Sequence, residues 1–329
     1  KVEDIDIKNN VILLSDDSKI SFDKLLISAG NINRSLQIEG INQKEIYYLR
    51  NIKESQNIKK KFQTVQNILI IGGGFIGLEI ASVANELGKN VTVIEAGSQL
   101  MGRVIPLEIA EIIHQKHRKH GVAIHLNTTV KSGVKKDLHY NLQLSTNKII
   151  QTEMILVGVG AEPNIGFLKN TGLKINNGLL TNEYGLTSIS NILAAGDISN
   201  FFHPFYNSHL RLESWKHAQN HGINAGNNIL ANNTIYDDIP WMWSDQYNYN
   251  LQLTGIHHGS DTYVQRGDNA EEGIIFFYLK NNQIIGACGL GERGKIGRDI
   301  RLTEMIIRQK KEVDASLLKD KNIKLQKLK

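Results

Sequence analysis

The sequence predicts an α/β fold in which two Rossmann-like dinucleotide-binding domains, one interrupted by the other, precede a smaller α+β domain. Three observations lead to this prediction. Strand, glycine turn, helix, strand and helix follow one another over residues 67–121, and such alternation builds a parallel sheet. After this complete unit, a further strand runs into Gly196-Asp197. Beyond Pro240 the composition changes to tryptophan and tyrosine, followed by strands and a basic helix.

The first part of the chain predicts a hairpin, a strand and a helix, in that order. Two apolar runs, 11–14 and 19–22, flank the polar tetrad 15–18, and such runs pair across a turn-rich stretch. A further strand is expected over 24–30, and the polar, helical pattern around 52–62 predicts a helix. A β-rich segment therefore precedes the glycine turn.

The rest of the chain predicts alternating helices and strands, with a meander between residues 122 and 151. The expected elements are strand 68–71, helix 75–87, strand 91–94, helix 107–120, strand 154–157, strand 192–195, helix 214–230, strands near 263–266 and 274–279, and a basic helix near 300–311. The Lys-rich tail from Lys319 is expected to be a frayed, solvated end.

A glycine motif is the first candidate binding element. Residues 72–77 fit G-x-G-x-x-G, directly after a strand and at the start of a helix, which is the context that gives this pattern its meaning. Gly72 allows the tight turn, Gly74 lets the backbone approach a pyrophosphate at the positive helix end, and Gly77 lets helix and strand pack closely. Alone, the motif is also compatible with a flexible turn.

Glu95 strengthens the nucleotide interpretation. It ends the next strand, 18 residues after Gly77, where an acidic side chain can accept hydrogen bonds from the adenosine ribose hydroxyls. Residues 96–98 include no arginine that could pair with a 2′-phosphate. The sequence therefore favours NADH over NADPH.

Glu79 and two tryptophans are weaker candidates. Glu79 lies two residues past the last glycine, near the expected nicotinamide, but a carboxylate there can equally be surface charge, or cap or pair with a neighbouring basic group. Trp241 and Trp243 share a face if they lie on a strand. They either pack in the core, the usual role of tryptophan, or roof a cofactor cleft between domains.

The histidines do not predict a metal site. His114, His117 and His120 have a spacing of three on an expected helix, but no carboxylate or cysteine partner is evident in the sequence. We interpret them as a polar helix face, and His257-His258 as a pair in a loop. We therefore predict no bound metal.

Composition excludes several classes of protein. Hydrophobic residues make up 41% of the chain, but no apolar run approaches the roughly 18 residues that a membrane helix needs. The single cysteine, Cys288, excludes an internal disulfide within these residues and suits a reducing cytoplasm. The formal net charge of +5 comes from scattered lysines and arginines. This argues against nucleic-acid binding and leaves room for a small acidic partner.

Seven runs of residues give the sequence a resemblance to a known family. They are 24–30, 48–50, 71–79, 158–164, 195–197, 211–215 and 240–246. With them the chain resembles the pyridine nucleotide-disulfide oxidoreductase superfamily and, within it, the ferredoxin reductases of Rieske-type oxygenase, cytochrome P450 and rubredoxin systems. The likeness covers essentially the whole chain, and the last two runs resemble the ferredoxin reductase branch in particular.

The resemblance implies the cofactors FAD and NADH and places residues at each. It implies Val2, Ala29, Gly30, Arg50, Asp197, Trp215 and Trp243 at the FAD, and Gly72, Gly74, Phe75, Ile76, Gly77, Glu79, Glu95, Arg103 and Gly160 at the NADH. Val2 would touch the adenine through its backbone, and Asp197 would bind the ribitol and pyrophosphate region. The Trp215 backbone N–H would face the pyrimidine edge of the flavin.

The resemblance also implies an activity, that of an FAD-dependent NADH:ferredoxin or NADH:rubredoxin reductase. A hydride would pass from NADH to FAD, and single electrons would then reach a [2Fe-2S] ferredoxin or a rubredoxin. Because the flavin does the chemistry, we expect no side chain to act as a general acid or base. Two alternatives stay open: an NADH oxidase, peroxidase or monodehydroascorbate-type reductase on the same fold, and a redox-responsive binding protein of the apoptosis-inducing-factor kind.

Domain boundaries complete the expectation. We predict an FAD domain from residues 1–49 and 180–238, an NADH domain from 50–179 and a C-terminal reductase domain from 239–329. The N-terminal glycine motif that receives the FAD pyrophosphate in this family is absent from the sequence. We therefore expect the native chain to extend upstream of Lys1, and the chain without that part to bind FAD poorly.

Overall fold

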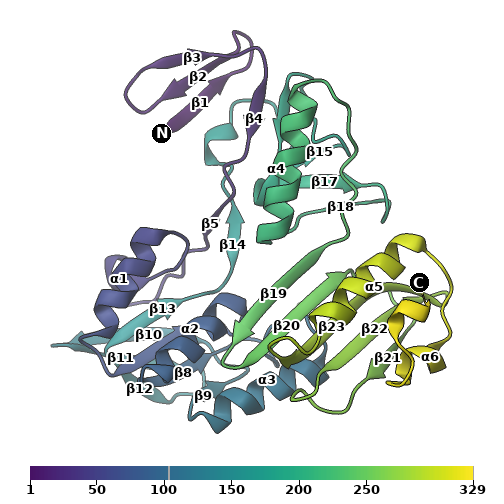
Figure 1. Ribbon diagram of the computed structural model, residues 1–329. Coiled ribbons are helices and arrows are strands. Elements are labelled where there is room, and N and C mark those ends of the chain that lie inside the picture. Colours follow the sequence, from purple (N-terminus) through teal and green to yellow (C-terminus); the bar gives the residue numbers. More distant parts are fainter. Residues whose placement is uncertain (103, 329) are drawn as a thin grey trace. The chain divides into compact units, whose positions relative to one another are not determined.

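The computed structural model describes residues 1–102 and 104–328, and each of its two units is built from two separate stretches of chain. The first unit comprises residues 1–32 and 161–242, and the second comprises 33–160 and 243–329. Figure 1 shows the elements of both. The predicted α/β fold class, with Rossmann-like parallel sheet features and a C-terminal α+β part, is confirmed.

A five-stranded parallel sheet forms the centre of the nucleotide-binding part of the second unit. Its order is β6 (Ile46–Tyr47), β13 (Met154–Val157), β7 (Asn67–Ile71), β8 (Asn90–Ile94) and β9 (Ala123–His125). Two of the inner strands, β13 and β7, are apolar and almost entirely buried, as strands covered on both faces must be. Their carboxyl ends lead into the turns at Gly72 and Gly158.

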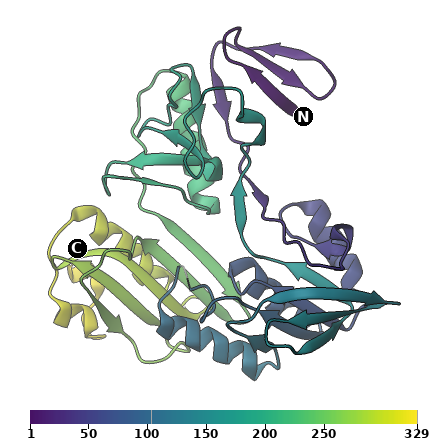
Figure 2. The ribbon, with the colours of Figure 1, turned by 180° about the vertical axis from the view of Figure 1, so that it is seen from behind.

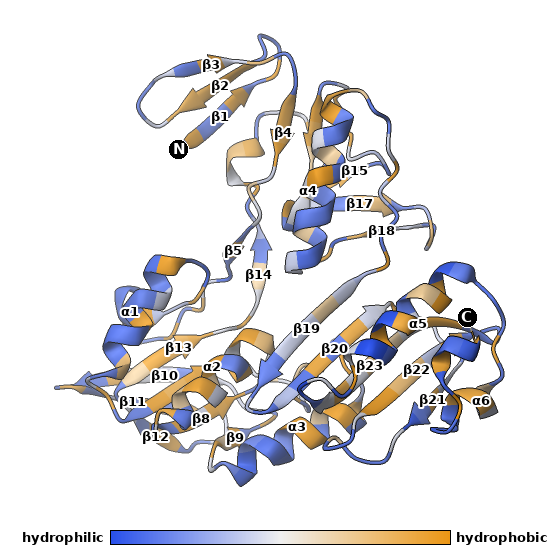
Figure 3. Ribbon diagram, viewed as in Figure 1, coloured by the Kyte–Doolittle hydropathy of each residue, from blue (hydrophilic) through white to orange (hydrophobic). Residues whose placement is uncertain are grey.

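Three helices accompany this sheet, and a meander lies beside it. The helices are α1 (Ile52–Phe62), α2 (Phe75–Glu86) and α3 (Leu107–Lys119), and the antiparallel meander consists of β10 (Val130–Lys136), β11 (His139–Leu144) and β12 (Ile149–Thr152), with the short η1 (Gln43–Glu45) before β6. Asn51 caps α1 by accepting a hydrogen bond from the Glu54 N–H (3.0 Å). Most of α1 is hydrophilic (Figure 3), and only its residues Ile58 and Phe62 are buried.

A second five-stranded sheet, covered by a helix, makes up the C-terminal part of the chain. Its order is β19 (Trp241–Gln246), β20 (Tyr249–Gly255), β23 (Gln283–Glu292), β22 (Ile274–Lys280) and β21 (Thr262–Arg266), and the helices are α5 (Gly297–Gln309), α6 (Ala315–Lys319) and η4 (Leu325–Leu328). Helix α5 packs on one face of this sheet (Figures 1 and 2). The strand β22 is strongly hydrophobic (Figure 3), as its burial requires.

The C-terminal tail corrects one prediction. The residues after Lys319 were expected to fray, but Leu325 is only 1% exposed. Arg266, itself buried, donates hydrogen bonds to the carbonyl groups of Leu318, Asp320, Lys321 and Ile323. The expectation of a frayed end is therefore wrong, because a cation on a distant strand holds the tail.

The first unit joins two distant stretches of sequence. Its elements are β1 (Val2–Asp6), β2 (Val11–Leu14), β3 (Lys19–Ser21), β4 (Leu25–Ile27), β5 (Asn31–Asn33), β14 (Ala161–Pro163), η2 (Gly166–Leu168), β15 (Leu179–Thr181), β16 (Ile192–Ala194), η3 (Gly196–Ile198), β17 (Ser199–His203), β18 (Ser208–Leu210) and α4 (Trp215–Ile229). Leu25 pairs with Ile192 in a parallel ladder of β4 and β16. The strand before Gly30 and the strand before Gly196 therefore share a sheet, as the sequence predicted.

Candidate functional site

The glycine turn of the second unit has the geometry that its sequence predicts. Gly72 adopts a φ of +109°, and a Cβ there would lie 2.4 Å from the Gly158 carbonyl oxygen. A Cβ on Gly77 would lie 2.1 Å from the Gly72 carbonyl oxygen. Both positions therefore require glycine, one for the turn and one for the approach of α2 to the strands.

Gly74 differs from these two glycines because it faces open space. A Cβ built on it would meet nothing within 4 Å in the described part of the chain. Gly74 is also the N-cap of α2, and among the described residues no side chain caps this end and no acidic residue lies in the first turn. The N–H groups and the positive dipole end of a twelve-residue helix thus border a space that a phosphate group can enter.

Glu95 is held against this turn by two backbone hydrogen bonds. Its Oε2 accepts from the Gly73 N–H (2.7 Å), and its Oε1 accepts from the Gly97 N–H (2.6 Å). Both bonds leave further lone pairs on the carboxylate oxygens. The structure therefore places a fixed negative charge beside the glycine turn, where the adenosine ribose of a nucleotide is expected.

Glu79 lies farther along α2 and is half-buried. The Ser244 hydroxyl donates a 2.6 Å hydrogen bond to its Oε1. The pKa of Glu79 is raised above its ordinary value, chiefly by burial. The hydrogen bonds from the Ser244 hydroxyl and the Asp245 backbone oppose this rise, and the Asp245 charge adds to it. The Glu79 carboxylate is thus not a free surface charge. Its hydrogen bonds join it to a hydroxyl and a backbone group rather than to a basic side chain.

The histidines of α3 correct a prediction. His117 is fully buried, and its Nε2 lies 2.9 Å from Gln246 Oε1. Burial lowers the pKa of His117 to about 4. His120 stacks on the Tyr247 ring, with centroids 3.9 Å apart. A polar helix face is therefore wrong for His117, because β19 and the turn after it cover this side of α3.

Gly160 and Arg103 complete the predicted NADH residues. Gly160 follows β13, has a φ of +102° and accepts a hydrogen bond from the Arg34 N–H (3.1 Å). Phe75 and Ile76 open α2, and Ile76 is exposed. Arg103 lies outside the described residues. The structure thus gathers Gly72, Gly74, Gly77, Glu79 and Glu95 around the N-terminal half of α2.

The first unit contains five of the residues predicted at the FAD. Val2 lies on β1, Ala29 and Gly30 follow β4, Asp197 lies in η3, and Trp215 is the first residue of α4. Gly30 and Gly196 have φ values of +62° and +75°, so the chain turns sharply after each of the two paired strands. Trp215 is 67% exposed. Arg50 and Trp243 belong to the second unit; Arg50 follows β6, and Trp243 lies on β19.

The sequence does not predict two polar groups that lie next to Asp197, those of Asn31 and Arg211. Asn31 Nδ2 lies 3.5 Å from Asp197 Oδ2, and Arg211 Nη1 lies 3.5 Å from both Asn31 Oδ1 and the Asp197 carbonyl oxygen. Arg211 also forms an ion pair with Glu213 (2.6 Å). The run 211–215 was the available signal for Arg211, whereas nothing local marks Asn31.

Buried histidines lie beneath the turn that carries Asp197. The Gly196 N–H donates to His221 Nδ1 (3.3 Å), and His217 Nδ1 lies 3.0 Å from the Tyr236 hydroxyl. Burial lowers the pKa of His217 to about 4 and that of His221 to about 3. Neutral rings therefore support this turn, and the turn, Asp197 and the start of α4 fit the ribityl and flavin-edge contacts of an FAD.

Together, the fold and these residues define a pyridine nucleotide-dependent oxidoreductase. The chain belongs to the pyridine nucleotide-disulphide oxidoreductase family, whose model matches residues 1–222. Residues 241–329 match the model described as reductase C-terminal. The resemblance predicted from the sequence is confirmed.

Individual relatives agree with this assignment. The chain is 29% identical over 309 residues to the ferredoxin–NAD(+) reductase component of the anthranilate 1,2-dioxygenase system of Burkholderia cepacia, covering 93% of this chain and 75% of that protein. The crystal structure of the ferredoxin reductase for the CYP199A2 system of Rhodopseudomonas palustris matches with a TM-score of 0.94 and 27% identity, covering 100% of this chain and 80% of that one. Putidaredoxin reductase in its covalent complex with putidaredoxin matches with a TM-score of 0.92 and 25% identity, covering 100% and 79%. The prediction of an FAD- and NADH-dependent oxidoreductase of the ferredoxin reductase type is thereby confirmed.

Among the described residues, no helix is both long and apolar enough to cross a bilayer.

Proposed function

We propose that this protein is an NADH-dependent reductase that passes electrons through FAD to a [2Fe-2S] ferredoxin or a rubredoxin. The observation that carries the proposal is the glycine turn with Glu95 bound against it, on a chain whose residues 241–329 match the reductase C-terminal model. When bound, FAD supplies the step that the side chains cannot perform, by accepting a hydride and releasing electrons singly.

The second unit binds and orients the nucleotide in this proposal. The N-terminus of α2 receives the pyrophosphate in the open space at Gly74, and Glu95 accepts hydrogen bonds from the adenosine ribose hydroxyls. Phe75, Ile76 and Gly160 line the path toward the nicotinamide, and Glu79 faces its carboxamide end. No side chain acts as a general acid or base.

The first unit holds the flavin. Asp197, at the end of a turn supported by His221, binds the ribitol and pyrophosphate region, and the backbone N–H of Trp215 at the start of α4 faces the pyrimidine edge. The positive end of this fifteen-residue helix stabilises negative charge there. Val2, Ala29 and Gly30 line the same cofactor.

Charge and the relatives support the proposed partner. Those relatives include a ferredoxin–NAD(+) reductase component and a reductase joined to putidaredoxin, and a net charge of +5 suits a small acidic electron acceptor. The same proposal includes a cytoplasmic location. It also includes three domains, an FAD domain of residues 1–49 and 180–238, an NADH domain of 50–179 and a C-terminal reductase domain of 239–329.

An electron-transfer assay tests the proposed function. The native protein, saturated with FAD and supplied with NADH, should reduce cytochrome c rapidly only when a [2Fe-2S] ferredoxin or a rubredoxin is present. A similar rate of NADH consumption without the iron–sulfur protein, accompanied by oxygen uptake, would instead indicate an oxidase. A long-lived complex with NADH and negligible cytochrome c reduction would indicate a redox-responsive binding protein.

A further inference from the structure

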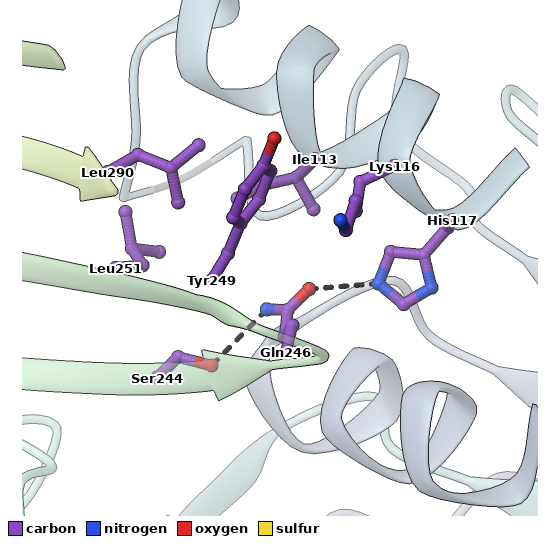
Figure 4. Close-up of a pocket in the computed structure, with 8 residues that line it drawn as sticks. All are labelled: Ile113, Lys116, His117, Ser244, Gln246, Tyr249, Leu251 and Leu290. Atoms are coloured by element: carbon purple, nitrogen blue, oxygen red, sulfur yellow. Dashed lines mark hydrogen bonds between the residues drawn. The ribbon is translucent and has the colours of Figure 1, made fainter. Parts of the chain in front are cut away.

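A chain of hydrogen bonds runs from α3 through β19 to Glu79, all within the second unit; Figure 4 shows its part from His117 to Ser244. His117 Nε2 lies 2.9 Å from Gln246 Oε1, and Gln246 Nε2 donates to Ser244 Oγ at 3.2 Å. The Ser244 hydroxyl donates to Glu79 Oε1 at 2.6 Å. Two side chains, those of Gln246 and Ser244, thus connect a buried imidazole with the carboxylate on the nucleotide-binding helix.

The direction of the hydrogen bonds is set by the carboxylate. An ionised Glu79 can only accept, so the single hydroxyl proton of Ser244 points to it. Ser244 Oγ must then accept from the amide group of Gln246, which turns the Gln246 oxygen toward His117. His117 in turn must carry its proton on Nε2, and every bond in the chain then donates toward Glu79.

Burial keeps this arrangement in place. Ser244, Gln246 and His117 are all buried. The cavity beside them, lined by Lys116 and Tyr249 among others, has a volume of only about 10 Å³ (Figure 4). That volume is at the lower limit for one water molecule, so the cavity has little room for solvent beside the intact side chains. The groups of the chain therefore depend on one another for their hydrogen bonds.

We propose that His117, Gln246 and Ser244 are positioning residues that fix the Glu79 carboxylate for the nicotinamide half of the bound dinucleotide. This inference rests on the proposed function, because it takes Glu79 as the group that faces the nicotinamide. In this role the C-terminal domain, which supplies Ser244 and Gln246, contributes to nucleotide binding without touching the nucleotide through these residues. A packing role alone would not distinguish one half of the dinucleotide from the other.

Binding of NAD⁺ and of ADP-ribose separates these roles. NAD⁺ does not react with oxidised flavin, and ADP-ribose contains the adenosine and pyrophosphate but lacks the nicotinamide. Calorimetric titration should show that Ser244→Ala and His117→Leu weaken NAD⁺ binding by about threefold to tenfold. Their ADP-ribose affinity should stay within about twofold of the wild-type value, which also shows that the variants are folded.

Two further variants serve as matched controls. His117→Gln keeps an N–H donor for Gln246 and should retain more NAD⁺ affinity than His117→Leu. Thr254→Val removes a buried hydroxyl from β20 that has no hydrogen-bond partner among the described residues, and it should leave both affinities unchanged. Equal losses for NAD⁺ and ADP-ribose in Ser244→Ala would overturn the inference in favour of simple packing.

Glu79→Gln distinguishes this inference from the proposed function. If Glu79→Gln weakens NAD⁺ binding but Ser244→Ala and His117→Leu do not, the positioning role is wrong and the place of Glu79 stands. If Glu79→Gln itself has no effect on NAD⁺ binding, Glu79 does not face the nicotinamide, and both the placement and the inference fail. Weakened NAD⁺ binding in all three variants supports the inference.

Discussion

Glu95 carries a charge whose position is fixed before any nucleotide binds. Two backbone N–H groups, one from the glycine turn and one from the loop after β8, orient its two oxygens. A carboxylate held in this way accepts hydrogen bonds from two ribose hydroxyls but repels a phosphate in the same place. Nucleotide preference is therefore a property of this one residue and its neighbours.

This argument gives a prediction about NADH and NADPH. Replacing Glu95 with Ala and Ala96 with Arg removes the repelling charge and adds a cation for the 2′-phosphate. The ratio of kcat/KM for NADH to that for NADPH should fall at least about tenfold, equivalent to about 1.4 kcal/mol. Steady-state kinetics with both nucleotides measure it, and an unchanged ratio would show that the ribose contact lies elsewhere.

The glycine turn gives a second prediction because its members differ in their surroundings. In Gly77→Ala the new Cβ would lie 2.1 Å from the Gly72 carbonyl oxygen, and the free energy of unfolding should fall by about 1 to 3 kcal/mol. In Gly74→Ala the Cβ meets open space at a φ of −84°, so stability should hardly change. Gly74→Ala should nevertheless weaken ADP-ribose binding, because the methyl group enters the space assigned to the pyrophosphate. Urea unfolding and calorimetric titration on both variants test the contrast, and equal stability losses would contradict it.

Among the elements, the tail after α5 shows how a distant residue orders a segment that looks disordered in sequence. Its lysines predict solvation, and many of them are indeed exposed. The segment is nevertheless fixed, because Arg266 on β21 donates to four of its carbonyl groups and Leu318 and Leu325 are buried. The planar guanidinium can satisfy several acceptors at once, which an ammonium group cannot do in the same geometry.

Arg266→Lys should therefore release the C-terminal segment. The lysine keeps the charge but loses most of the hydrogen bonds, and we expect stability to fall by about 3 kcal/mol. Hydrogen exchange should accelerate over residues 315–328 while β7 and β8 stay protected. As a matched control, Lys321→Ala removes exposed ion pairs with Asp268 (2.8 Å) and Glu272 (3.8 Å) and should change stability by less than about 1 kcal/mol. Equal exchange in Arg266→Lys and wild-type protein would show that packing alone holds the tail.

At the scale of the whole molecule, the sequence predicts what depends on local pattern and order along the chain. The alternation around the glycine motif gives the parallel sheet, and the late return to a strand before Gly196 gives the pairing of β4 with β16. The sequence does not predict the hydrogen-bond partners of Glu79 and His117. Ser244 lies 165 residues from Glu79 and Gln246 lies 129 residues from His117, and no local pattern indicates either pair. Such contacts arise only when the C-terminal sheet packs beside α2 and α3.

Three buried histidines give both units the same sensitivity to acid. Burial lowers the pKa of His117 and His217 to about 4 and that of His221 to about 3. In the unfolded chain each titrates near its ordinary value of about 6.5. Between these values the unfolded chain binds more protons than the folded one, so the stability contributed by the neutral rings is complete above pH 6.5 and is lost as the pH falls toward 4.

We therefore expect the free energy of unfolding to fall between pH 6.5 and 4.5, by at most about 1.4 kcal/mol per pH unit for each histidine. Carboxylates such as Asp6 and Asp314, whose pKa is lowered by hydrogen bonds from Asn9 and Ser316, respectively, lose their contribution only below about pH 4. Urea unfolding at half-unit pH intervals measures the slope. His117 lies in the second unit and His221 in the first. We therefore expect His117→Gln and His221→Gln each to reduce the slope of the free energy of unfolding against pH, and the double variant to reduce it more than either single variant. Slopes that match the wild-type slope in all three variants would show that the buried rings do not cause the acid sensitivity.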